Sequence, residues 1–204
     1  MKKITRYVII GALVSGVLGT TGAYFYQYYT TYYTTNHGFN YGPAGLYTGI
    51  RAYTEQDKAF FKRVFSENFY FLTSNMQTNI DNIVDTLSPN EYEQRYRGKL
   101  KIVVLYETEF GKPEKQIGFC CYYMLNEYIG RLLFLCIDKQ VQGKRYGERL
   151  VQYALEDLRR MGAKFVRMWC RIENSNARKL YERLGFVNLH EDLSTGFIDY
   201  RKNI

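Results

Sequence analysis

Two short stretches decide the fold of this sequence: Gln142–Gly147 (QGKRYG) and Asn174–Phe186 (NSNARKLYERLGF). The first comes directly after 131–137 (RLLFLCI), an apolar run of strand length. It opens a segment in which apolar residues recur at helical steps. A strand, a short loop and a helix in this order bring unpaired backbone N–H groups and the positive end of the helix dipole together. The sequence therefore predicts an anion site that suits a pyrophosphate, and the alternative is an ordinary strand-to-helix turn.

The helix that follows this loop has one buried face. Its apolar positions are Leu150, Val151, Ala154, Leu155 and Leu158. Gly162 follows basic residues of the last turn, as at many helix ends. Lys144 and Arg145 add positive charge at the predicted anion site.

The second stretch predicts a short capped helix. Either Asn174 or Ser175 can accept a hydrogen bond as its N-cap, and Gly185 ends it. Tyr181 lies one turn before that end. A tyrosine in this position is most often a core residue whose hydroxyl has a partner.

Together these stretches resemble the cofactor-binding half of the GNAT-type N-acetyltransferase superfamily. The family's phosphate loop, Gln/Arg-x-x-Gly-x-Gly/Ala, is matched at Gln142 and Gly147, but Arg145 replaces the first glycine. The family's next helix, Asn-x-x-Ala-x-x-Leu-Tyr-x-x-x-Gly-Phe, is matched at Asn174, Ala177, Leu180, Tyr181, Gly185 and Phe186. Residues 47–57 resemble its opening strand and first helix more weakly, so the resemblance covers about residues 47–201.

The resemblance implies a mixed sheet whose fourth and fifth strands splay apart around acetyl-CoA. The pantetheine arm would pair with backbone near Leu135, Cys136 and Ile137. The pyrophosphate would meet backbone amides of the loop, namely those of Gln142, Gly143, Lys144, Arg145, Tyr146, Gly147 and Glu148. Asn174 and Asn176 would hold the pantetheine or the helix cap. Tyr181 would be the general acid that protonates the leaving thiolate, because a phenol with a pKa near 10 carries its proton at neutral pH.

A base for the incoming amine is not assigned. Relatives that modify protein N-termini often carry a carboxylate early in the fourth strand. The nearest acid here is Glu127, and Glu173 is a second candidate after the fifth strand. Solvated turn carboxylates are the alternative for both, and a water molecule could serve instead.

The rest of the chain predicts an α/β (α+β) domain over residues 47–204. Residues 55–72 and about 76–97 have aromatic and aliphatic residues at helical steps. Five segments are rich in β-forming residues: 101–107, 116–125, 129–137, 164–172 and 196–201. Strands alternating with helices are typical of a layered domain.

The N-terminal region forms a separate part. Residues 7–26 are apolar or small, follow Lys2, Lys3 and Arg6, and are long enough to span a bilayer as one transmembrane helix. We expect a membrane anchor over residues 1–26 with the sidedness of the domain undecided. The alternative is a signal peptide cut after Ala23. Residues 27–46, rich in Tyr, Thr and Gly, are interpreted as a linker.

Charge and cysteine content add weaker evidence. The net charge of +8 suits a polyanionic cofactor, an acidic acceptor or an anionic lipid surface. No nucleic-acid motif is present. The cysteines, at 120, 121, 136 and 170, show no CxxC spacing and no histidine cluster, so no metal site is expected. Buried free thiols are expected, and a disulfide between neighbouring strands is the alternative.

The sequence thus predicts a membrane-anchored enzyme that moves acetyl from acetyl-CoA to a primary amine of an unidentified acceptor: a protein N-terminus, a lysine or a small amine. The second hypothesis is an inactive module that binds or senses acyl-CoA, since Arg145 replaces a glycine. The third is an exported structural protein on the same fold.

Overall fold

The computed structural model describes residues 40–41, 46–73, 100–109 and 112–204. The chain divides into two compact units, residues 1–50 with 107–113, and residues 51–106 with 114–204. In the first unit, β1 (Asn40–Tyr41) pairs antiparallel with β2 (Leu46–Ala52). The predicted membrane segment 7–26 and the predicted helix 76–97 lie outside the described residues. Among the helices that are described, none is long and apolar enough to span a membrane.

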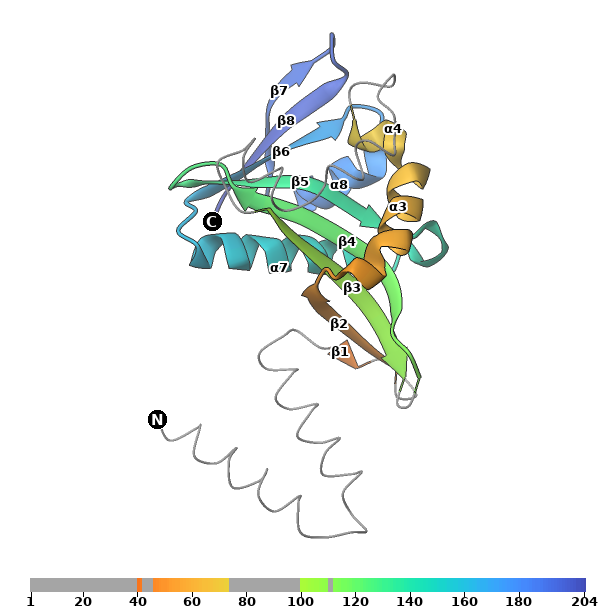
Figure 1. The fold of residues 1–204 in the computed structure, drawn as a ribbon. Helices are drawn as coiled ribbons and strands as arrows, with labels where there is room; N and C mark the ends of the chain where they lie inside the picture. The colour runs from red at the N-terminus through yellow and green to blue at the C-terminus, as the bar shows by residue number, and fades with distance from the viewer. Residues whose placement is uncertain (1–39, 42–45, 74–99, 110–111) are drawn as a thin grey trace, which may run out of the picture. The chain divides into compact units, whose positions relative to one another are not determined.

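The second unit is built on a sheet in the order β3-β4-β5-β6-β8-β7 (Figure 1). The strands are β3 (Lys101–Glu109), β4 (Lys115–Met124), β5 (Ile129–Ile137), β6 (Phe165–Arg171), β7 (Val187–Asp192) and β8 (Phe197–Asn203). β5 is antiparallel to β4 but parallel to β6, and β8 is antiparallel to both β6 and β7. The predicted mixed sheet is therefore confirmed.

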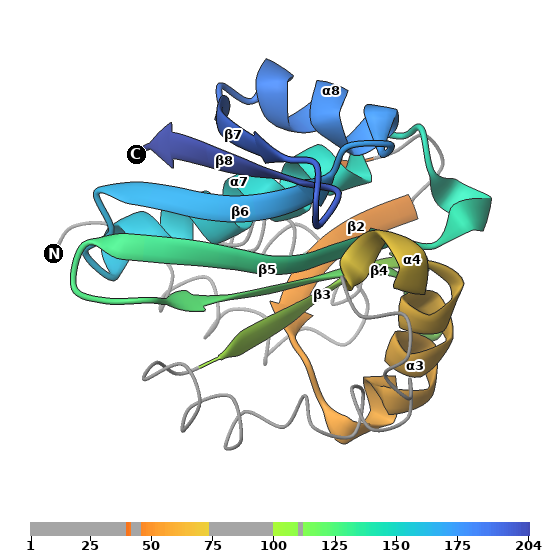
Figure 2. The same ribbon diagram turned by 90° about the horizontal axis from the view of Figure 1, so that it is seen from above.

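β5 and β6 pair over only part of their length. Their register joins Ile129–Arg131 to Phe165–Arg167 and goes no further, although both strands continue. Beyond Arg167, β6 keeps its pairing with β8 as far as Arg171. The two parallel strands thus part after Arg131, which confirms the predicted splay. Figure 2 shows β5 and β6 as neighbouring strands of the sheet.

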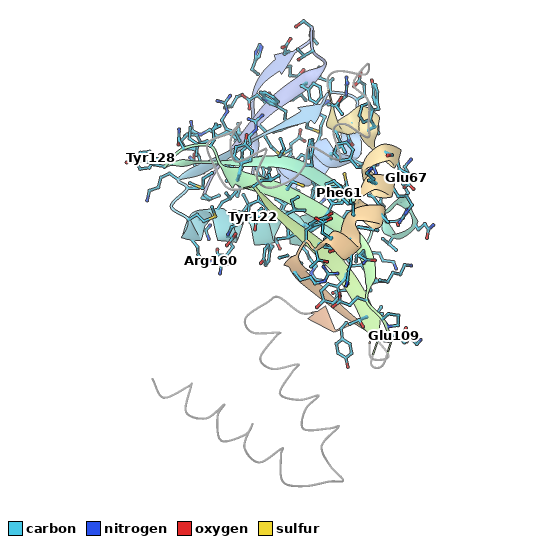
Figure 3. The ribbon with its side chains drawn as sticks, in the orientation of Figure 1. Phe61, Glu67, Glu109, Tyr122, Tyr128 and Arg160 are labelled. Carbon is cyan, nitrogen blue, oxygen red and sulfur yellow. The ribbon has the colours of Figure 1, made fainter. Side chains whose placement is uncertain are left out.

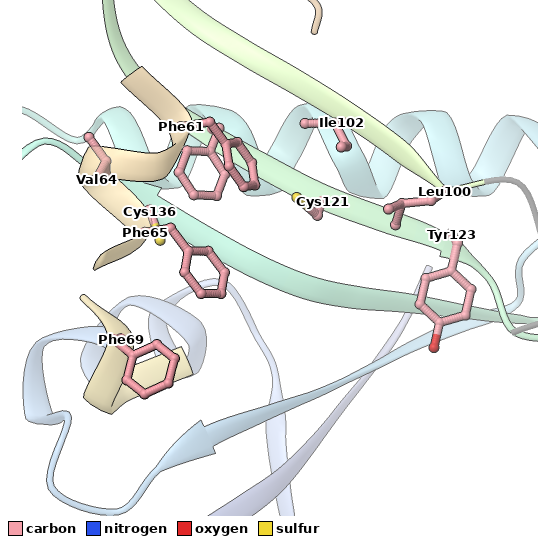
Figure 4. Packing of buried hydrophobic residues seen from close by; sticks show 10 residues of the cluster. Phe61, Val64, Phe65, Phe69, Leu100, Ile102, Cys121, Tyr123 and Cys136 are labelled. Atoms are coloured by element: carbon pink, nitrogen blue, oxygen red, sulfur yellow. The ribbon is translucent and has the colours of Figure 1, made fainter. Parts of the chain in front are cut away.

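Helices cover both faces of this sheet (Figure 2). On one face lie α3 (Lys58–Glu67) and α4 (Phe69–Leu72). Figure 4 shows their aromatic side chains directed at the sheet, with Phe65 near Cys136. Phe61 stacks on Phe119 of β4 with ring centroids 4.0 Å apart. This aromatic layer fixes α3 beside the open half of β5.

The opposite face carries α7 (Tyr146–Arg160) and α8 (Ser175–Arg183). A Cβ on Gly130 would come 2.8 Å from Leu158, so α7 packs directly on β5. The hydroxyl of Tyr122, labelled in Figure 3, donates a 2.9 Å hydrogen bond to Asp157 of α7. The predicted glycine ends are confirmed, since Gly162 and Gly185 both have positive φ after these helices.

The structure differs from the sequence prediction in two elements. The predicted helix 55–72 is a 3-10 turn (Glu55–Asp57) followed by α3 and α4, which are separated at Asn68. The Asn68 side chain donates to the carbonyl of Val64 at 2.7 Å and competes with the helical hydrogen bonds there. Strand β7 was not predicted, because all but its last residue are exposed and it has no continuous apolar run.

Candidate active site

The predicted anion site lies where β5 leads into α7. After Ile137 the chain makes a 3-10 turn, Lys139–Val141, and the Asp138 carboxylate accepts a 3.0 Å hydrogen bond from the backbone N–H of Gln140. The Gln142 side chain donates to the carbonyl of Ile137 at 3.0 Å and ties the loop back to the strand. The loop Gln142–Arg145 then ends directly at the first turn of α7.

Two loop residues have left-handed backbone conformations. Gly143 has φ 85° and Arg145 has φ 61°. Arg145 is the one residue other than glycine with positive φ in the described part of the chain. A side chain in this conformation costs about 1–2 kcal/mol. Position 145 thus has the backbone shape that glycine adopts easily, and this chain forms it with an arginine.

Gly147 lies at the contact of three elements. A Cβ there would be 3.2 Å from Leu180 of α8, 3.8 Å from Leu135 and 3.9 Å from Ile137 of β5. The missing side chain thus lets the start of α7 approach both β5 and α8. Arg183 of α8 also donates to Glu148 at 3.2 Å. The structure thus brings Leu135 and Ile137 of β5 close to Gly147, the last residue of the loop motif.

The open half of β5 is apolar but only half-buried. Leu133, Phe134, Leu135 and Ile137 all have intermediate exposure, although β5 is an inner strand of the sheet. A β-bulge lies in this half: Cys121 pairs with Phe134 and Tyr122 with Leu132, so Leu133 has no partner on β4. Bulges re-aim backbone groups and often lie next to active sites. Nothing in the sequence indicated this bulge, because it arises from the register between strands.

Tyr181 lies on α8 and is 5% exposed. Its ring packs edge-on against Phe186 (5.8 Å between centroids) and tilted against Tyr200 (6.2 Å). No hydrogen bond joins its hydroxyl to another described side chain. Burial raises the pKa of Tyr181 well above that of an ordinary phenol, and Cys170, Cys120 and Cys136 nearby raise it further. Tyr181 is therefore protonated at every physiological pH.

The two asparagines at the start of α8 differ. The Asn174 carboxamide accepts from Ala177 N at 3.1 Å, so Asn174 is the N-cap that the sequence left open between two residues. Asn176 is exposed in the first turn of α8. Of the two roles that the resemblance implies, the structure gives Asn174 the helix cap.

The carboxylates considered as bases lie at opposite ends of the sheet. Glu127 is exposed in the β4–β5 turn, before β5 begins, and Glu173 is exposed after the end of β6. At the point where β5 and β6 part, the Arg131 guanidinium lies 3.9 Å above the ring of Trp169. Trp169 is 62% exposed, so an indole face meets solvent beside the splay. No pattern in the sequence pointed to either residue.

All four cysteines are free and buried, as expected. Burial raises the pKa of each thiol, so each is neutral at pH 7. Within the described ranges, no group of three or more His, Cys, Asp or Glu could hold a metal ion.

Comparisons with known proteins agree with this geometry. The model of the acetyltransferase (GNAT) family matches residues 67–186. An uncharacterised N-acetyltransferase of Methanocaldococcus jannaschii is 28% identical over 79 residues, a stretch that spans 37% of this chain and 35% of that relative.

Solved structures show the same fold. A domain from Methanocaldococcus jannaschii superposes with a TM-score of 0.60 at 20% identity and covers 77% of this chain and 98% of its own. A candidate acetyltransferase of Salmonella typhimurium, solved with acetyl-CoA, has a TM-score of 0.59 at 16% identity and covers 76% and 93%.

This protein thus belongs to the GNAT family of acetyltransferases, which the family match over more than half of the chain establishes. The resemblance to the GNAT family that the two sequence stretches predicted is thereby confirmed.

Proposed function

We propose that this chain moves the acetyl group of acetyl-CoA to a primary amine, with the phosphates on the Gln142–Glu148 segment and the pantetheine arm along β5. The observation that carries the proposal is the half-paired β5–β6 junction. Its open end leads directly into the loop that starts α7. Backbone amides, a helix N-terminus and the basic residues Lys144 and Arg145 meet there, and together they suit a pyrophosphate.

The open half of β5 offers two things to a pantetheine arm. Its backbone from Leu133 to Ile137 has no β6 partner, so its N–H and C=O groups on that side can pair with the amides of the arm. Its half-buried apolar side chains, including Leu135, cover the aliphatic part. In this proposal the backbone N–H of the unpaired bulge residue Leu133 polarises the thioester carbonyl.

Tyr181 supplies the proton that the reaction needs. When the amine nitrogen forms its bond to the acyl carbon, the C–S bond breaks and the electron pair goes to sulfur. The nitrogen loses one proton to a water molecule, which leaves a neutral amide. The Tyr181 hydroxyl gives its proton to that thiolate and later recovers one from solvent. Because burial raises its pKa, the phenol holds this proton across the working pH range.

Labelled acetyl transfer tests the proposal. The full chain is incubated with radiolabelled acetyl-CoA and three kinds of acceptor: a peptide with a free α-amine, a blocked peptide with one lysine, and a small diamine. We expect label on at least one amine and one free CoA thiol per acetyl transferred. Binding of acetyl-CoA without transfer to any amine would favour the inactive binding module. Failure to bind acetyl-CoA would overturn both.

A further inference from the structure

One ion pair connects the helix layer of α3 to the segment that leads into the phosphate loop. Arg63 of α3 donates to the Asp138 carboxylate at 2.6 Å, across 75 positions of sequence. Asp138 is 5% exposed, whereas the Arg63 side chain is 46% exposed. The buried partner is thus the one beside the candidate active site.

Asp138 is held from three directions. Its backbone N–H donates to the carbonyl of Ile117 on β4 at 2.9 Å. One carboxylate oxygen caps Gln140, and the other accepts from Arg63. Arg63 lowers the pKa of Asp138, so the carboxylate is ionised at neutral pH. Because this charge is nearly buried, loss of Arg63 would leave it only the weaker attraction of Lys115, four residues before Gln142.

Arg63 itself is placed by rigid surroundings. α3 packs on the sheet through Phe61, Val64 and Phe65, each at most 3% exposed. At the start of α3, Asp57 accepts hydrogen bonds from Arg51 (2.7 and 2.9 Å) and from Gln116 of β4 (3.1 Å). The helix is therefore fixed to β4 before it reaches Arg63. Arg63 also donates a 3.1 Å hydrogen bond to Glu67, which lies one helical turn further along α3 and on its outer side in Figure 3.

We infer that Arg63 is a positioning residue for CoA: through Asp138 it holds the end of β5 and the following turn in the shape that presents the loop amides to the cofactor's phosphates. The inference rests on the proposed function, because it assumes that the phosphates bind at Gln142–Glu148. It also means that the helix layer opposite α7 influences cofactor affinity without touching the cofactor.

Ligands with and without phosphates separate this role from a general effect on the fold. Arg63→Met removes the charge and keeps an aliphatic stem beside Phe60, over whose ring Arg63 lies. Calorimetry on the full chain would measure Kd for CoA and for pantetheine, which lacks the phosphates. We expect CoA affinity to fall about tenfold and pantetheine affinity to change less than twofold. The matched control, Glu67→Gln, removes only the outer partner and should change neither.

Asp138→Asn provides a second route, because asparagine can still cap Gln140 but carries no charge for Arg63. It should weaken CoA binding as much as Arg63→Met, and the double variant should be no weaker than either single one. Unchanged CoA affinity in the folded variants, or equal losses for CoA and pantetheine, would overturn the positioning role. If the wild-type chain does not bind CoA, both the positioning role and the proposed function are wrong. If the wild-type chain binds CoA but the variants do not lose CoA affinity as expected, only the positioning role is wrong.

Discussion

Replacing Tyr181 with phenylalanine shows whether Tyr181 acts as a proton donor or only as a packing residue. The ring contacts with Phe186 and Tyr200 remain, and no hydrogen bond to a described side chain is lost. The free energy of unfolding should therefore change by less than about 0.5 kcal/mol. In contrast, kcat should fall about 100-fold, the low end for general acid catalysis, which equals about 2.7 kcal/mol of activation free energy.

The matched control is Tyr200→Phe. Tyr200 is buried like Tyr181, but its hydroxyl donates to Glu182 at 2.8 Å. Its loss should cost about 1 kcal/mol of stability and leave kcat within twofold. Urea unfolding and initial rates with a saturating amine measure both quantities. A near-normal kcat for Tyr181→Phe, or equal losses of kcat in the two variants, would refute the assignment of Tyr181 as the acid.

Three further predictions follow from particular contacts. A Cβ on Gly118 would lie 2.8 Å from the backbone oxygen of Cys136 and 2.5 Å from Ile137, so Gly118→Ala should lower the free energy of unfolding in urea by about 1–3 kcal/mol. Gly147→Ala should lower it by less than half as much, because the nearest atom to the new Cβ belongs to the flexible Leu180 side chain. Equal losses of stability in the two variants would contradict this packing argument. The buried thiols of the folded chain keep their protons at a pH where the thiols of the unfolded chain have lost theirs. The free energy of unfolding should therefore be constant up to about pH 8 and then fall by up to about 1.4 kcal/mol per pH unit for each thiol. A free energy of unfolding that stays constant to pH 10 would contradict this. We also propose that residues 7–26 anchor the chain, so it should remain with membranes after an alkaline wash, and protease added to sealed vesicles would report the side of residues 51–204; a soluble protein that begins at Tyr24 would instead show a cleaved signal peptide.

Local chemistry made much of the fold predictable. β5 has the predicted bounds, Ile129–Ile137, because the continuous apolar run 132–137 lies close after the exposed turn at residues 125–128. The ends of α7 and α8 follow from glycines that adopt positive φ, and the Asn174 cap follows from a side chain that reaches its own helix. These features depend on neighbours within a few residues.

Features that depend on distant residues were not predictable. The bulge at Leu133 exists only in the register with β4, and the ion pair of Arg63 with Asp138 joins two separate elements. β7 was missed because an exposed edge strand does not need an apolar face, and Val187 and Leu189 are 62% and 52% exposed. Asn68 interrupts the predicted helix 55–72 through a hydrogen bond from its side chain to Val64, and the sequence alone does not show that this bond forms.

Amide hydrogen exchange of the full chain with and without acetyl-CoA tests the central claim most directly. If the phosphates bind at the start of α7 and the arm lies along β5, saturating acetyl-CoA should slow exchange at residues 133–137 and 142–148. The β7–β8 hairpin, residues 187–203, should exchange as before. Bound acetyl-CoA that leaves both segments unprotected, or that protects the hairpin instead, would contradict the account.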